Sequence, residues 1–127
     1  MLLRITPMLE AVNLQTTIHY YQSKLGFHLC SQWPDDGEPE SEWVMLQRDS
    51  IEIMYTSRNE HHKDRPTGLT GTLYCYTDDV KSLWNEWKDM VEIAWALEDF
   101  PYGMREFGIR DCNKYLLSFG QNIPLHQ

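Results

Sequence analysis

Cysteine is scarce in this chain, and its pattern excludes two common kinds of structure. The 127 residues include three cysteines, Cys30, Cys75 and Cys112, an odd number spread far apart. No Cys-x-x-Cys pair occurs, so the sequence supports neither a disulfide framework nor a zinc ribbon. We therefore expect reduced thiols and a cytoplasmic protein. Cys75 alternates with Tyr74 and Tyr76, which predicts a buried packing residue rather than a nucleophile.

Basic residues and long apolar runs are also few. The chain has 11 Lys and Arg against 19 Asp and Glu, a net charge of −8. Binding to nucleic acid needs Lys and Arg opposite the phosphates, so we expect no nucleic-acid partner. Residues 1–6 contain no apolar run of signal-peptide length, and no stretch approaches a membrane span, so we expect no membrane partner. Neither a Gly-x-Ser-x-Gly elbow nor a glycine-rich phosphate loop is present.

The composition is that of a globular protein, with 42% hydrophobic and 24% charged residues. A chain of this length can bury a substantial core, and we expect one domain over residues 1–127. The strongly acidic balance is explained most simply by solubility.

Two segments have the spacing of amphipathic helices and suggest an internal repeat. Asn13 and Asp79 are the predicted N-caps, and Gly26 is the predicted C′ residue of the first helix. Val80 and Trp87 of the second helix follow Leu14 and Tyr21 of the first by 66 residues each, near half the chain length. These apolar positions are Leu14, Thr17, Ile18, Tyr21 and Leu25 in the first helix, and Val80, Leu83, Trp84 and Trp87 in the second.

Strand-like runs surround each helix in the same order, so we predict the unit βαβββ twice. The units span residues 3–57 and 72–120, and a polar linker spans 58–71. Within the linker, His61 and His62 are adjacent, and such pairs on a charged loop are more often solvent-exposed than metal ligands. The predicted strands are residues 3–12, 27–33, 43–48, 51–56, 72–77, 91–97, 104–110 and 115–119.

The chain resembles the vicinal oxygen chelate superfamily, which includes glyoxalase I, bleomycin-resistance proteins and extradiol dioxygenases. The resemblance is carried by residues 7–27, by the Thr77-Asp78-Asp79-Val80 junction, and by a hairpin whose tight turn runs from Asp111 to Tyr115 and which ends in Phe119. It implies an α+β fold in which two βαβββ units form an eight-stranded open cup with helices outside. It also points to a homodimer.

Strand alternation predicts which side chains face the cup. Glu10, Glu52 and Glu106 would place three carboxylates there, together with aromatic and methionine side chains. Rim or core positions are the alternative interpretation for each of these residues, because the facing rests on alternation alone. The predicted ligand-binding residues are Met8, Glu10, Trp43, Glu52, Met54, Tyr74, Tyr76, Tyr102, Glu106 and Ser118.

The metal ligands that the resemblance implies are mostly missing. Metal-dependent relatives bind a divalent ion through His, Glu and sometimes Gln, and the corresponding positions here are Thr6, Glu52, Thr72 and Ser118. Only Glu52 is a competent ligand for Zn²⁺, Ni²⁺ or Fe²⁺. We therefore expect no metal and no other cofactor. A substitute oxygen site made of the three cup glutamates is a second, weaker possibility.

Two functions from different classes remain open. The first is a metal-free binding protein of the glyoxalase/bleomycin-resistance type, which takes a cationic or donor-rich small molecule into an acidic aromatic cup. The second is a lyase, isomerase or dioxygenase-like enzyme that uses cup carboxylates or a non-standard metal site. The sequence does not identify the ligand.

The first prediction concerns metal content. The purified protein should hold no stoichiometric divalent metal by inductively coupled plasma mass spectrometry, before or after incubation with Ni²⁺, Zn²⁺, Mn²⁺ or Fe²⁺. A tightly held metal near one per chain would show that the ligand positions are misaligned and would favour a metalloenzyme.

Overall fold

The computed structural model describes residues 1–35, 42–58 and 65–124, and the chain divides into two compact units, Met1–Thr67 and Gly68–Gln127. The boundary falls inside the predicted linker, while His61 and His62 lie outside the described residues. None of the helices in the described part of the chain is long and apolar enough to span a membrane.

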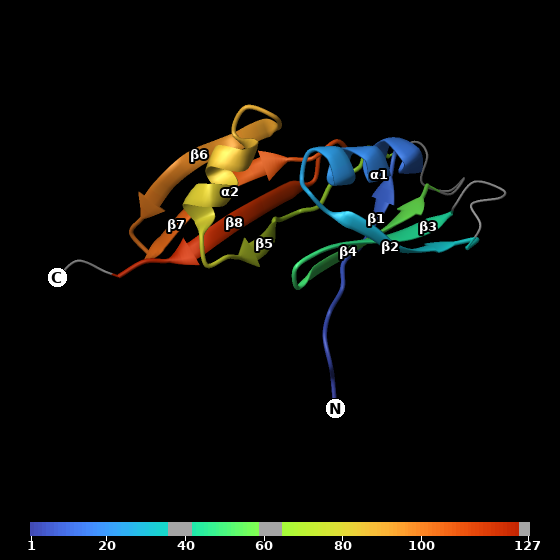
Figure 1. The fold of residues 1–127 in the computed structure, drawn as a ribbon, viewed down its shortest axis with the longest axis horizontal. Helices are drawn as coiled ribbons and strands as arrows, with labels where there is room; N and C mark the ends of the chain where they lie inside the picture. The colour runs from blue at the N-terminus through green and yellow to red at the C-terminus, as the bar shows by residue number, and fades with distance from the viewer. Residues whose placement is uncertain (36–41, 59–64, 125–127) are drawn as a thin grey trace. The chain divides into compact units, whose positions relative to one another are not determined.

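Each unit is a four-stranded mixed sheet with one helix, in the order βαβββ (Figure 1). In the first unit β1 pairs in parallel with β4, and the strand order is β1-β4-β3-β2. The second unit repeats this arrangement as β5-β8-β7-β6. The predicted α+β class with two βαβββ repeats is therefore confirmed. The elements are β1 (Met8–Ala11), α1 (Leu14–Ser23), β2 (His28–Trp33), β3 (Trp43–Arg48), β4 (Ile51–Ser57), β5 (Leu73–Tyr76), α2 (Val80–Trp87), β6 (Glu92–Phe100), β7 (Met104–Arg110) and β8 (Leu116–Asn122).

Both helices begin at the predicted caps. The Asn13 side chain accepts a hydrogen bond from the Thr16 backbone N–H at 2.9 Å, and Asp79 accepts one from Ser82 at 3.2 Å. The end of α1 was predicted too late, because the helix stops at Ser23 with Lys24 as its C-cap. Gly26 lies beyond that cap, where φ is +75° and the chain turns into β2.

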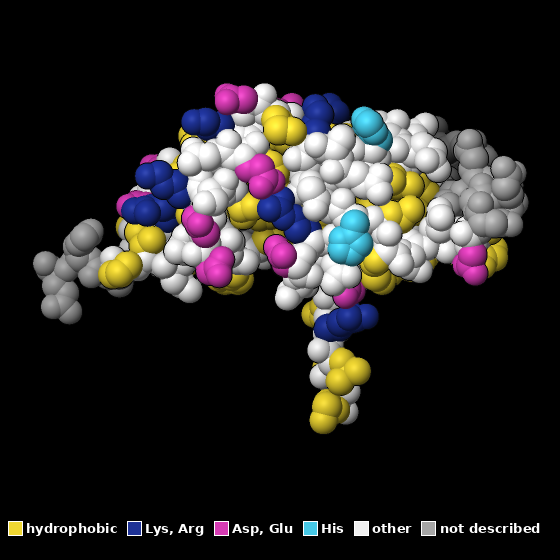
Figure 2. Space-filling model, in the orientation of Figure 1, with side chains coloured by type: hydrophobic (Ala, Val, Ile, Leu, Met, Phe, Trp, Pro, Cys, Tyr) yellow, Lys and Arg dark blue, Asp and Glu magenta, His cyan; other side chains and the backbone are white. Residues whose placement is uncertain are grey.

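The first strand is shorter than predicted. It starts at Met8, which is paired with Met54 of β4, whereas residues 3–7 form no strand. Pro7 has no N–H to donate to the ladder, although its carbonyl accepts from the Met54 N–H at 2.9 Å. Apolar side chains of residues 1–5 are exposed where this segment projects from its unit (Figure 2).

The core of each unit lies between its helix and one face of its sheet. In the first unit a 2.7 Å hydrogen bond joins the hydroxyls of Tyr21 in α1 and Tyr55 in β4, and both rings are fully buried. In the second unit Trp87 of α2 packs edge-on against Phe107 and Phe119, with ring centroids 6.1 and 4.9 Å away. The apolar alternation of β7 and β8 thus places one face of this sheet against α2, as predicted.

The β7–β8 turn is built around one buried carboxylate. Asp111 Oδ1 accepts hydrogen bonds from the backbone N–H groups of Asn113 and Tyr115, both at 2.9 Å. Lys114 takes a positive φ of 69°, and its N–H donates to the Asp111 carbonyl at 2.9 Å. The predicted tight turn is present, and Asp111 provides its side-chain acceptor.

Asp111→Ala should lower the free energy of unfolding by about 3 kcal/mol, because two buried backbone donors lose their acceptor. Asp111→Asn, which keeps one carbonyl acceptor, should lose less. The measurement is urea unfolding followed by circular dichroism. Asp89→Ala, the same change at an exposed turn position after α2, is the control and should stay within about 0.5 kcal/mol of the parent. Equal losses of unfolding free energy in Asp111→Ala and Asp89→Ala would contradict the role of Asp111 as the side-chain acceptor of this turn.

Candidate functional site

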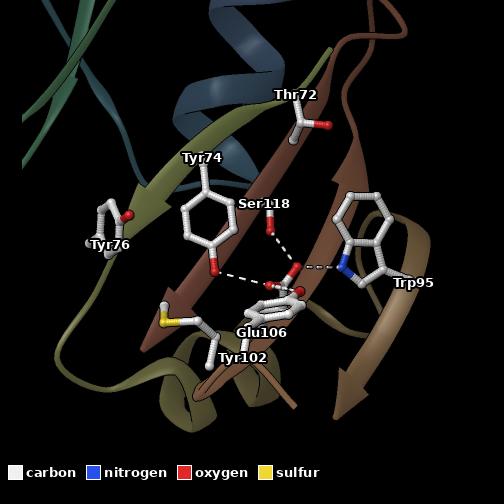
Figure 3. A pocket seen from close by; sticks show the side chains of 8 residues that line it. Thr72, Tyr74, Tyr76, Trp95, Tyr102, Glu106 and Ser118 are labelled. Carbon is white, nitrogen blue, oxygen red and sulfur yellow. Dashed lines mark hydrogen bonds between the residues drawn. The ribbon is translucent and has the colours of Figure 1, made fainter. Parts of the chain in front are cut away.

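A pocket of about 440 Å³ lies on the face of the second unit's sheet that points away from α2 (Figure 3). Its volume is in the usual range for small-molecule sites. All its lining residues belong to this one unit: Thr72, Tyr74, Tyr76, Trp95, Tyr102, Met104, Glu106 and Ser118.

Strand register explains why these side chains meet. Tyr74 of β5 is paired with Ser118 of β8, Ser118 with Gly108 of β7, and Gly108 with Trp95 of β6. Residues that are paired across neighbouring strands project from the same face of a sheet. Four successive strands therefore present tyrosine, serine, glycine and tryptophan in one row.

Glu106 occupies the neighbouring row of the same face. It is paired with Gly120 of β8 on one side and with Glu98 of β6 on the other. Gly120 is in turn paired with Tyr76 of β5. Each of the two rows thus contains one glycine near its centre.

The two glycines let aromatic side chains lie across the sheet. A Cβ atom built on Gly108 would lie 2.5 Å from the Trp95 indole, and a Cβ on Gly120 would overlap the Tyr74 hydroxyl. Any larger residue at either position would push the ring away. Glycine here provides the space through which Trp95 and Tyr74 reach Glu106.

Glu106 accepts four hydrogen bonds from neutral donors. Its Oε1 accepts from the hydroxyls of Tyr74 at 3.0 Å and Tyr102 at 2.5 Å. Its Oε2 accepts from the Trp95 indole N–H and from the Ser118 hydroxyl, both at 3.1 Å, and the Ser118 hydroxyl also lies 3.3 Å from the Phe107 carbonyl oxygen. A carboxylate offers about four lone-pair sites, so both oxygens are fully engaged.

These bonds keep the group ionised. Burial alone raises the pKa of Glu106 and is the largest single influence, but the hydrogen bonds from Tyr102, Tyr74, Ser118 and Trp95 together hold that pKa below its usual range. The same contacts raise the pKa values of the two tyrosine hydroxyls. Burial and then the Glu106 contact raise the pKa of Tyr74, and the hydrogen bond to Glu106 raises the pKa of Tyr102 to about 12. At neutral pH the cluster is one carboxylate held by neutral donors.

No cation neutralises this carboxylate among the residues that the structure describes. Glu106 is 4% exposed, and none of the ion pairs found in those residues includes it. Aromatic rings form the walls above it. The Tyr74 and Tyr76 rings lie 5.2 Å apart, and Phe100 stacks on Tyr102 at 5.4 Å. The pocket therefore combines a buried negative charge with several exposed ring surfaces.

Five of the ten predicted ligand-binding residues line this pocket: Tyr74, Tyr76, Tyr102, Glu106 and Ser118. The other five lie in the first unit: Met8, Glu10, Trp43, Glu52 and Met54. There the two glutamates have cationic neighbours, since Arg4 is 3.1 Å from Glu52 and Arg58 is 3.7 Å from Glu10. A role in ligand binding remains a prediction for all ten.

Trp95 and Met104 were not predicted as site residues. Strict alternation along β6 would place Trp95 on the same face as Ile93, which is paired with Ile109 on the α2 side. A bulge between Ile93 and Trp95 shifts the register and turns Trp95 to the pocket instead. The aromatic content of residues 91–97 was visible in the sequence, but the bulge was not.

The residues at the superfamily's metal positions do not suit a transition metal. Ser118 already donates its hydroxyl to Glu106, Thr72 offers a neutral hydroxyl, and Glu52 is the one carboxylate of the set. In residues 1–35, 42–58 and 65–124, no three His, Cys, Asp or Glu side chains come together as a metal-binding group. The predicted substitute site draws Glu10 and Glu52 from the first unit and Glu106 from the second, and it stays a prediction.

Comparison with known proteins gives one family and many similar folds. Residues 8–119 match the model of the Glyoxalase/Bleomycin resistance protein/Dioxygenase superfamily. TioX from Micromonospora sp. ML1 has 17% identity and a TM-score of 0.76, over 94% of this chain and 98% of its own. A glyoxalase/bleomycin resistance protein/dioxygenase from Nocardioides has 12% identity and a TM-score of 0.74, over 100% and 89%. A bleomycin-binding protein in complex with bleomycin has 18% identity and a TM-score of 0.69, over 94% and 98%. No curated protein sequence matches the chain.

Glu106→Gln should destabilise the protein by about 3 kcal/mol at neutral pH, because the amide nitrogen faces donors that it cannot accept from. Because the pKa of Glu106 is lower in the folded state than its ordinary value of 4.5, its ionised form stabilises the fold above pH 4.5, and this stabilisation is lost as the pH falls below 4.5. The difference in free energy of unfolding between the parent and Glu106→Gln should therefore become smaller below pH 4.5.

The measurement is urea unfolding between about pH 7 and about pH 3, where the linkage operates. Asp89→Asn, the same carboxylate-to-amide change at an exposed position after α2, is the control and should show no such narrowing. If the difference in free energy of unfolding between the parent and Glu106→Gln stays constant over this pH range, the conclusion that Glu106 is an ionised, hydrogen-bonded carboxylate would be contradicted.

Proposed function

The chain belongs to the Glyoxalase/Bleomycin resistance protein/Dioxygenase superfamily, and we propose from this premise that it is a small-molecule-binding protein whose ligand is cationic or rich in hydrogen-bond donors. The proposed site is the pocket of the second unit. The ten predicted residues divide between both units, and the five that line this pocket are the ones on which the proposal rests.

The observation that carries the proposal is the charge of Glu106, for which the described part of the chain provides no ion-pair partner. Four neutral donors stabilise the carboxylate but leave its net charge in place. A cation about 5 Å away would gain roughly 3 kcal/mol at an effective dielectric constant of about 20. Tyr74, Tyr76 and Trp95 add ring faces that attract cations and apolar groups.

The similar solved structures support binding of a small molecule by a protein of this fold. One of them is a bleomycin-binding protein that was crystallised with bleomycin. At 18% identity the likeness concerns the fold, so the chemistry of the ligand is argued from the pocket alone.

The enzymatic alternative receives less support from the same residues. A general acid at neutral pH needs a raised pKa, whereas the pKa of Glu106 is lowered and both its oxygens are occupied. Glu10 and Glu52 each lie near an arginine, with Arg58 3.7 Å from Glu10 and Arg4 3.1 Å from Glu52, so both carboxylates already have a cationic neighbour. The site is thus better suited to holding a charge than to transferring a proton.

We further propose a cytoplasmic homodimer. No disulfide joins any two of the three cysteines, Cys30, Cys75 and Cys112, which suits a reducing compartment. Each sheet is open and leaves two edge strands, β1 and β2 in the first unit and β5 and β6 in the second. Exposed strand edges are commonly covered by a partner subunit.

A thermal-shift screen with cationic aromatic compounds and neutral compounds of matched shape tests this function. The cationic members should raise the unfolding midpoint more. Tyr76→Ala removes a ring that is 71% exposed, and should weaken binding by about 1 kcal/mol without loss of folding. Leu69→Ala, an exposed truncation outside the pocket lining, is the control and should bind as the parent does. A screen without any cation preference would contradict the proposal.

A further inference from the structure

The number of further hydrogen bonds that Glu106 can accept limits which kind of cation suits this pocket. We propose that the cation it recognises carries no N–H groups, as in a quaternary ammonium, and is held by the rings of Tyr74, Trp95 and Tyr102 above Glu106. This inference rests on the proposed function, because it names the chemical class of cation within it.

The first argument is the saturation of Glu106. Each oxygen already accepts two hydrogen bonds, from Tyr74 and Tyr102 on Oε1 and from Trp95 and Ser118 on Oε2. A primary ammonium carries three donors and is strongly hydrated, so on entering the pocket it would lose water without gaining the carboxylate as an acceptor. The oxygens that remain in the lining belong to neutral hydroxyls.

The second argument is the arrangement of the rings. Tyr74 comes from β5, Trp95 from β6 and Tyr102 from the β6–β7 turn, and all three point toward Glu106 from different sides (Figure 3). Ring faces that surround a cation from several directions are a known way to bind quaternary ammonium groups, whose charge is spread over methyl groups.

The third argument is rigidity. The hydrogen bonds to Glu106 hold the three rings in place, and Phe100 stacks on Tyr102 with an angle of 14° between the ring planes. The glycines Gly108 and Gly120 leave room for these ring positions. A site whose walls are already ordered loses less entropy when it binds, which favours a ligand that relies on ring contact alone.

The test compares three molecules of similar shape by NMR titration at neutral pH. These are choline, ethanolamine as its primary-ammonium counterpart, and 3,3-dimethylbutanol as its uncharged counterpart. Choline should bind about tenfold more tightly than either of the other two.

A pair of variants connects this preference to Glu106. Tyr102→Phe keeps the ring but frees one acceptor position on Oε1, so the ratio of choline to ethanolamine affinity should fall. Tyr76→Phe removes the hydroxyl of a neighbouring ring that makes no hydrogen bond to Glu106 among those found in the described residues, and it should leave that ratio unchanged.

The outcomes separate this inference from the broader function. Ethanolamine binding as tightly as choline, or a ratio that Tyr102→Phe leaves unchanged, would overturn the inference and leave a cation-binding site. If none of the three binds while the cationic aromatic compounds do, the inference fails alone. If 3,3-dimethylbutanol equals choline, or if neither set binds, both proposals fail.

Discussion

The second unit is organised around a buried carboxylate, Glu106, that has no counter-ion among the residues described and is stabilised by hydrogen bonds from neutral groups. Moving an ionised group out of water costs several kcal/mol unless hydrogen bonds replace its hydration. Glu106 gains them from four places in the chain: β5, β6, the β6–β7 turn and β8. Each donor is held in place by the same contact that it provides. The charge and the shape of the pocket therefore depend on one set of bonds.

The two faces of this sheet have different roles, one in packing and the other in forming the pocket. On one face Trp87 of α2 forms a buried aromatic core with Phe107 and Phe119. Cys75 belongs to this face, and burial raises the pKa of its thiol to about 11, which keeps it protonated and unreactive. Apolar burial there stabilises the unit, so the opposite face can keep a polar cluster and exposed rings that contribute less to folding.

Local patterns predicted the repeat and part of the site, and contacts between strands determined the rest. Period-two alternation correctly put Glu106 on the face opposite Phe107, because alternation is a property of a single strand. It could not place Trp95, since a bulge in β6 is set by pairing with β7. The role of Gly108 depends on a ring that lies across it from another strand. The start of the strand predicted from residue 3 was also wrong, as pairing with β4 begins at Met8.

The two repeats stabilise the carboxylates Glu10, Glu52 and Glu106 by different kinds of interaction. In the first unit Glu10 and Glu52 keep some exposure and lie near Arg58 and Arg4. A nearby cation cancels most of the field that a carboxylate projects to its surroundings. Hydrogen bonds from neutral groups stabilise Glu106 equally well, yet they leave its full charge to act on whatever enters the pocket. With the same topology, Glu10 and Glu52 of the first unit lie beside arginines, whereas the donors found for Glu106 in the described part of the second unit are all neutral, and the proposed function depends on that difference.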